Sequence, residues 1–85
     1  MNNTLDNLSE ELKIAVNQIA ESIKPIIDDI HKMDAVSKNY YAEYLNVLSH
    51  ASNKGKGYVK LLAISMLKAG CNPIGIDAAV KIMYN

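Results

Sequence analysis

The sequence predicts an all-α protein, a small bundle of about four helices that forms one domain over residues 1–85. Apolar residues recur at helical spacing along most of the chain, and hydrophobic residues make up 49% of it. Turn-forming residues gather at two places, 53–57 and 70–73, where they separate helical segments. A chain of 85 residues is long enough for one small core and no more.

The first helix is expected over about residues 5–33, with Asn3 or Thr4 as its N-cap. A line of apolar residues falls seven apart: Leu5, Leu12, Ile19, Ile26 and Met33. Pro25 has no N–H to donate, but the seven-residue spacing continues unchanged across it, which favours a kink over a break. At about 43 Å this helix would extend beyond a body about 30 Å across.

The second helix is expected over about 35–52, with Asp34 as its cap. The third, over about 58–69, is apolar nearly all round and should be the buried, central one. The fourth is expected over about 73–84. Gly70 should end the third helix in a left-handed conformation, and Asn72 should cap the fourth, on which Asp77 and Lys81 are spaced for an ion pair.

The apolar arcs of these helices are wider than contact with one core requires. A monomer of this size has too little interior to bury all of them, so the sequence predicts a homo-oligomer. The simplest form is a two-fold dimer in which the first helix packs against its symmetry mate.

Charge is distributed unevenly beneath a net charge of zero. Residues 1–34 hold seven acids against three lysines, a net charge of −4, and residues 35–85 hold two acids against six lysines, a net charge of +4. All nine basic residues are lysines, and arginine is the preferred side chain for reading guanine and clamping phosphate. Direct nucleic-acid binding is therefore not expected, and Ser65, Met66 and the single base Lys81 fit a helix-turn-helix poorly.

The composition also indicates a location. Cys71 is the one cysteine and cannot form an internal disulfide. The start, MNNTLDNLSEEL, has no basic segment followed by an apolar run, and no stretch is apolar enough to cross a bilayer. We expect a cytoplasmic protein that does not enter a membrane.

Catalytic and metal-binding patterns are weak. Neither histidine has a nearby nucleophile with a supporting acid, so no enzyme activity and no cofactor are expected. The pair Asp28 and His31 has the spacing of a bundle metal ligand set, but a second such motif is missing. We expect this pair to face solvent or a partner, with Asp28 forming an ion pair with Lys32 and with no metal bound.

The segment 53–60 allows two interpretations. Its glycines and lysines could form an anion site at the start of the third helix, with tyrosines as stacking surfaces for a base. Alternatively it is a solvated loop beside core tyrosines. The candidate residues are Lys54, Gly55, Lys56, Gly57, Tyr58, Lys60, Tyr40 and Tyr44.

In character, the chain resembles the small all-helical proteins that bacteriophages use to disable host defence, anti-CRISPR proteins among them. The residues behind this resemblance are the Asn-, Lys- and Ile-rich body without arginine, and the closing segment LKAGCNPIGIDAAVKIM. The resemblance implies a class of action, stoichiometric binding to a host protein, and assigns no site residue.

The sequence therefore leads to a main hypothesis and two alternatives. The main one is a non-catalytic binding protein that inhibits a macromolecular target. Its candidate contacts are the acids of the first helix and two residues at the edge of the second: Glu10, Glu21, Asp28, Asp29, Tyr41 and Leu45. The alternatives are an oligomer that sequesters a phosphate-bearing, cyclic nucleotide signal through segment 53–60, and a helix-turn-helix DNA-binding regulator.

Overall fold

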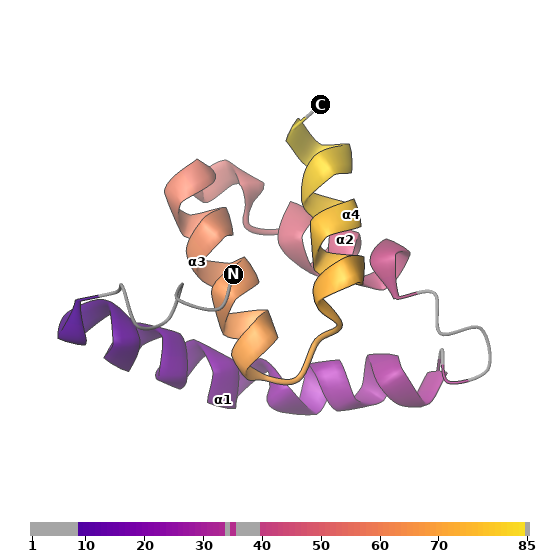
Figure 1. Ribbon diagram of the computed structural model, residues 1–85, viewed down its shortest axis with the longest axis horizontal. Helices are drawn as coiled ribbons and strands as arrows, with labels where there is room; N and C mark the ends of the chain where they lie inside the picture. Colours follow the sequence, from indigo (N-terminus) through magenta and orange to yellow (C-terminus); the bar gives the residue numbers. More distant parts are fainter. Residues whose placement is uncertain (1–8, 34, 36–39, 85) are drawn as a thin grey trace.

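The computed structural model describes residues 9–33, 35 and 40–84, and this part of the chain is an all-α bundle, as predicted. The helices are α1 (Glu10–Met33), α2 (Tyr41–Ser49), α3 (Lys56–Lys68) and α4 (Pro73–Tyr84), with a short 3-10 turn, η1 (Ser52–Lys54), between α2 and α3. Within the described residues there is no strand. Figure 1 shows α1 running along one side of the molecule, with α3 and α4 standing above it and α2 lying behind α4.

Helix α1 begins later than the sequence suggested. Ser9 is its N-cap, because the Ser9 hydroxyl oxygen accepts a hydrogen bond from the Leu12 N–H at 3.2 Å. The expected caps Asn3 and Thr4 lie outside the described residues. With 24 residues, α1 is about 36 Å long. This nearly equals the 37 Å long axis of the molecule and exceeds the other two axes of 27 and 24 Å, so α1 itself sets the longest dimension, and its first turns extend past α3 in Figure 1.

The helix continues through Pro25 without a break, as the unchanged seven-residue spacing indicated. Pro25 is exposed, and so is Glu21, whose carbonyl oxygen the proline leaves without its helical N–H partner. The buried residues of α1 are Val16, Ala20, Ile27 and Ile30. This face is centred about one position around the helix from the predicted line of apolar residues seven apart. Of the predicted line, Leu5 lies outside the described residues, Ile19 is half-buried, and Leu12, Ile26 and Met33 are exposed, Met33 to 73%.

Helix α2 is shorter than predicted at both ends. It begins at Tyr41 instead of 35, and the expected cap Asp34 lies outside the described residues. It ends at Ser49 because the chain then tightens: the Ala51 N–H donates to the Leu48 carbonyl, three residues back instead of four. The Ser52 hydroxyl donates to the carbonyl of Ser49 at 2.8 Å, which satisfies one of the groups that the ending helix leaves open.

Helix α3 starts at Lys56, two residues before the predicted start. Gly55 has φ 96°, in the left-handed region that glycine tolerates, and its carbonyl accepts the first helical bond, from the Val59 N–H. Lys56 and Gly57 are thus part of the first helical turn and not of a loop. The prediction that this helix is the central one is confirmed, since five of its residues are buried: Val59, Leu62, Ile64, Ser65 and Met66.

The turn between α3 and α4 follows the prediction closely. Gly70 has φ 103°, the Cys71 N–H donates to the Met66 carbonyl at 3.0 Å, and the Gly70 N–H donates to the Leu67 carbonyl at 3.1 Å. These two bonds form a Schellman motif. The Asn72 side-chain oxygen then accepts the Ile74 N–H at 3.0 Å and caps α4.

The core lies where the four helices meet. Its largest fully buried apolar side chains come from α1, α2 and α3: Tyr44, Ile27, Leu48, Met66, Val16 and Val59. Helix α4 contributes the smaller set Ile76 and Ala79. Large apolar side chains also remain on the surface, as the wide arcs indicated: Leu12, Ile14, Ile26, Met33, Tyr41, Ile74, Ile82 and Tyr84. Homo-oligomerisation itself stays a prediction.

Candidate functional site

An open apolar groove lies between α3 and α4. The two helices diverge from the tight turn at Gly70 (Figure 1), and their facing sides enclose two adjoining hollows of about 340 and 370 Å³. Both hollows share Ala63 and Val80 as lining residues, so they form one groove. The remaining apolar walls are Val59, Ile64 and Leu67 from α3 and Ile76 from α4.

Cations line the rim of this groove. Lys60 borders both hollows, and Lys56 borders the hollow nearer the C-terminus of α4. Lys81 borders the second hollow, where Asp77 is the one acidic lining residue. All these charged side chains are exposed. The groove thus combines an apolar floor with a predominantly positive edge, a surface suited to a ligand that is apolar on one side and negatively charged on the other.

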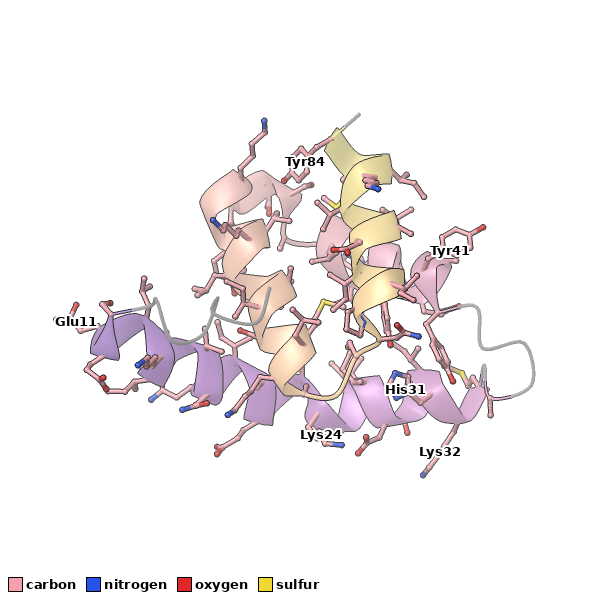
Figure 2. The ribbon with its side chains drawn as sticks, in the orientation of Figure 1. Glu11, Lys24, His31, Lys32, Tyr41 and Tyr84 are labelled. Carbon is pink, nitrogen blue, oxygen red and sulfur yellow. The ribbon has the colours of Figure 1, made fainter. Side chains whose placement is uncertain are left out.

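Tyr84 belongs to the same end of the groove. The Lys56 ammonium lies over its ring at 5.1 Å from the centroid, and Figure 2 shows Tyr84 beside the start of α3. Sequence reasoning missed this residue. The contact could have been predicted from the antiparallel hairpin, because Lys56 and Tyr84 are each fourteen residues from Gly70 and so lie opposite each other on the two helices.

The predicted anion site is only partly assembled. The Lys54 ammonium lies 4.8 Å from the centroid of Tyr58, and both residues flank the start of α3 with Lys56 and Lys60. Tyr40 and Tyr44 lie elsewhere, at the other end of α3, which is 13 residues long, hence about 20 Å away. The structure therefore separates the lysines from two of the tyrosines that were expected to stack a base.

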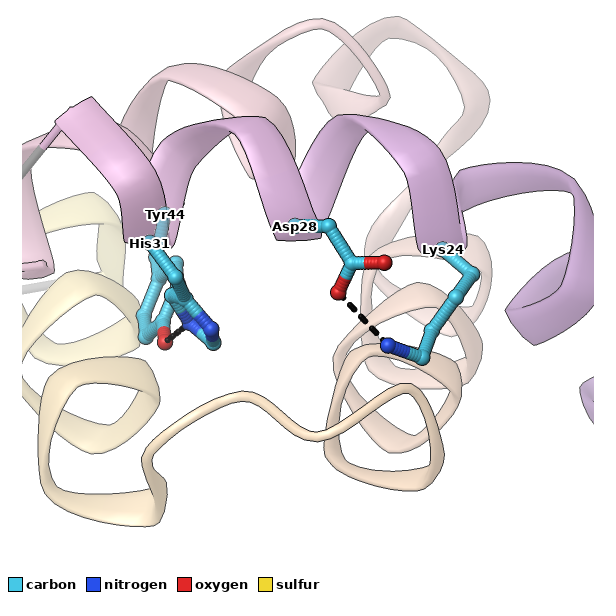
Figure 3. A network of polar contacts seen from close by, with 4 residues as sticks. All are labelled: Lys24, Asp28, His31 and Tyr44. Atoms are coloured by element: carbon cyan, nitrogen blue, oxygen red, sulfur yellow. Dashed lines mark hydrogen bonds and ion pairs between the residues drawn. The ribbon is translucent and has the colours of Figure 1, made fainter.

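Tyr44 instead joins three segments of the core. Its hydroxyl lies 2.7 Å from His31 Nε2 (Figure 3). The same hydroxyl accepts the Asn72 N–H at 2.9 Å. The Tyr44 hydroxyl therefore joins His31 of α1 to the backbone of the α3–α4 turn. Tyr40 stacks on Tyr44 with 5.8 Å between ring centroids. Burial raises the pKa of Tyr44 to about 12, against the lowering effect of the Asn72 N–H.

His31 was therefore predicted wrongly. It is half-buried against Tyr40 and Tyr44 and does not face solvent with Asp28. The predicted partner of Asp28 was also wrong: its carboxylate accepts a hydrogen bond from Lys24 at 2.6 Å, on the preceding turn, and not from Lys32 (Figure 3). This bond is the main reason why the pKa of Asp28 lies below its ordinary value.

The acidic face of α1 is open to solvent. Glu10, Glu21, Asp28 and Asp29 are all exposed. The ion pairs found in the described part of the chain join Lys13 to Glu10 at 3.6 Å and Lys24 to Asp28, both within α1. Glu21 shares a hollow between α1 and α3 with Lys68, but the ion pairs of the described residues do not join α1 to α3 or α4.

The other two predicted contact residues are placed differently. Tyr41 is exposed and points away from the body in Figure 2, whereas Leu45 is half-buried and packs against the core. Both belong to α2, and the backbone nitrogen of Tyr41 lies 3.7 Å from where a Cβ on Gly75 would stand. The structure thus places Tyr41 beside α4, away from the acidic face of α1.

Cys71 lacks the features of a reactive nucleophile, and α4 lacks those of a helix that contacts DNA. Cys71 is buried, and burial raises the pKa of its thiol to about 11, so the reactive thiolate is disfavoured. On α4, the exposed face carries Ile74 and Ile82 beside the single base Lys81, an unfavourable composition for phosphate contact.

Among the residues the structure describes, His, Cys, Asp and Glu side chains do not gather in threes as a metal site would need. Within residues 9–33 and 40–84, every helix is too short or too polar to cross a bilayer. Comparison of the chain with protein-family models, with curated proteins and with solved structures finds no match.

Proposed function

We propose that this protein acts without catalysis, as a binding protein that holds a segment of another macromolecule in the α3–α4 groove. The observation that carries the proposal is the groove itself, with apolar walls from both helices and Lys56, Lys60 and Lys81 at its edge. An amphipathic helix with a negatively charged flank fits such a surface, because its apolar side chains can enter the groove while its acids meet the lysines. The resemblance to phage inhibitors supports a host protein as the target, bound one to one in the cytoplasm.

The test is a selection from a library of random peptides displayed on an inert scaffold. The expected result is enrichment of sequences with apolar residues at helical spacing and with Asp or Glu beside them. The double substitution Lys60→Glu and Lys81→Glu should shift the selected flanks from acidic to basic. The Ala63→Arg variant, which fills the groove where its two hollows meet, should select nothing. If the Ala63→Arg variant enriches the same peptides as the native chain, the groove is not the binding site.

The acidic face of α1 supports a second mode of binding. Because its acids are exposed and the ion pairs of the described residues stay within the helix, the face is available to a positively charged surface, such as the nucleic-acid-binding surface of a target. Reversing Glu21 and Asp29 to lysine should weaken such a complex and remove its dependence on salt, while the groove selection stays as in the native chain. An affinity that ignores ionic strength would exclude this second mode.

A further inference from the structure

The outer face of α4 carries an apolar stripe that the rest of the described chain leaves uncovered. Ile74, Ala78 and Ile82 follow one another at intervals of four residues, so they lie in one row along the helix. Ile74 is 79% exposed and Ile82 is 54% exposed. Tyr41 of α2 extends the stripe sideways, since its backbone passes close to Gly75. A row of this kind needs a partner surface.

The row is symmetric about Ala78. If a second α4 lies antiparallel across it with the two-fold axis at Ala78, each residue faces the one equally far from Ala78 in the other direction. Ile74 then meets Ile82 of the second copy, and Ile82 meets Ile74. The small side chain of Ala78 at the centre allows the two helix axes to approach closely, so the larger isoleucines interlock on either side.

The charges beside the row have the same symmetry. Asp77 and Lys81 lie on one flank of it, one residue before Ala78 and three residues after it. In the antiparallel pair, Asp77 therefore comes within two residues, about 3 Å along the axis, of Lys81 of the second copy. The predicted pair between Asp77 and Lys81 of the same helix was wrong, since the described residues contain no such ion pair. Both charges are exposed and available for the pair across the two-fold axis.

The exposed line on α1, which suggested a dimer through that helix, lacks this complementarity. The flank of Leu12, Ile26 and Met33 carries Glu11 and Asp29. An antiparallel two-fold pairing of that line would bring the two acidic flanks together, and like charges in contact weaken association.

We propose that two copies of this chain pair through the outer face of α4, antiparallel and two-fold symmetric about Ala78. One helix face and Tyr41 make a smaller surface than a standard interface, so we expect a weak dimer that dissociates on dilution. The interface borders the α3–α4 groove at Asp77 and Lys81 and leaves the walls of the groove open.

The first experiment is sedimentation equilibrium of the full chain from about 5 to about 500 µM, the range in which a weak interface of this kind dissociates. Three isoleucines of nearly equal exposure serve as matched sites: Ile82 (54%), Ile26 (52%) and Ile14 (56%). Ile82→Glu should weaken dimerisation by at least about tenfold, because it places a charge in the apolar row. Ile26→Glu and Ile14→Glu should leave dimerisation unchanged. A monomer at every concentration, or a dimer that Ile26→Glu abolishes and Ile82→Glu does not, overturns the proposal.

The second experiment tests the antiparallel arrangement. Asp77→Lys gives a chain with two lysines on the flank, and Lys81→Asp gives a chain with two aspartates. Each alone should dimerise about three- to tenfold more weakly than the native chain. An equimolar mixture of the two variants should associate more tightly than either one, because every like-charge contact becomes an opposite-charge contact. A mixture no tighter than its components shows that residues 77 and 81 do not meet across the axis. Circular dichroism of each variant confirms that it is folded.

Discussion

At the scale of single residues, Tyr44 links α2 to the end of α1 and to the start of α4. Its ring is fully buried, and its hydroxyl bonds to His31 and to the Asn72 N–H. Tyr44→Phe keeps the ring and leaves both partners without their hydrogen bond, so it should lower the free energy of unfolding by about 2 kcal/mol. The matched control is Tyr40→Phe, on the neighbouring half-buried ring, whose hydroxyl has no hydrogen bond in the described residues; it should change stability by less than about 0.5 kcal/mol. Urea denaturation at pH 7 compares them, and equal effects would mean that the hydroxyl of Tyr44 contributes nothing specific.

Cys71 gives the fold a predictable response to alkaline pH. Burial raises the pKa of its thiol from 9.0 to about 11, so the folded chain holds this proton more tightly than the unfolded chain does. The contribution of Cys71 to stability is therefore constant below pH 9 and should fall by about 1.4 kcal/mol per pH unit between the two pKa values. Cys71→Ala should remove this part of the pH dependence, although the variant is less stable at pH 7. Urea midpoints at pH 8, 9 and 10 measure the slope, and an equal slope in both proteins would contradict the assignment.

At the scale of helices, Gly75 explains how closely α4 approaches α2. A Cβ on this residue would stand 2.8 Å from Tyr44 Cε2 and 2.9 Å from Tyr44 Cδ2, and that ring is held by its two hydrogen bonds. Gly75→Ala should therefore destabilise the protein by about 1–2 kcal/mol, although alanine is the better helix former by about 1 kcal/mol.

The matched control for Gly75→Ala is Gly57→Ala in the first turn of α3, where the added Cβ would meet no atom within 4 Å. With no contact to oppose it, the higher helix propensity should stabilise the protein by about 0.5–1 kcal/mol. Thermal unfolding followed by circular dichroism compares both variants with the native chain. Shifts of the same sign at Gly57 and Gly75 would show that propensity, and not the close approach to Tyr44, decides the outcome.

Some features of the helices and turns could be predicted from the sequence, and others could not. The α3–α4 turn could be predicted because Gly70, Asn72 and Pro73 each act on the backbone within four residues. The ends of α2 could not be, because the tightening after Ser49 depends on competing local hydrogen bonds. The role of His31 and the position of Tyr84 depend on which distant elements meet, and helical spacing gives only the face, not the neighbour. The groove was missed for the same reason, since it depends on the angle between α3 and α4.

At the scale of the whole molecule, the charges are separated between α1 and the α3–α4 hairpin. Both ion pairs in the described residues are exposed and join side chains three or four residues apart in α1. Ion pairs of this kind contribute little to stability and are screened by salt. The charge separation therefore does not hold the fold together, and the exposed charges remain available to partners.

This layout predicts that the fold is nearly insensitive to salt. Between about 20 mM and about 500 mM NaCl, the free energy of unfolding should change by less than about 1 kcal/mol, because the ion pairs affected are local and solvated. Lys24→Gln removes the cation next to Asp28 and should lower stability slightly at low salt and less at high salt. Urea titrations at both salt concentrations provide the measurement. A loss of more than about 2 kcal/mol at high salt would require long-range attraction between the acids of α1 and the lysines of the hairpin. Those acids would then be part of the fold and not a free surface, and the second mode of binding would lose its basis.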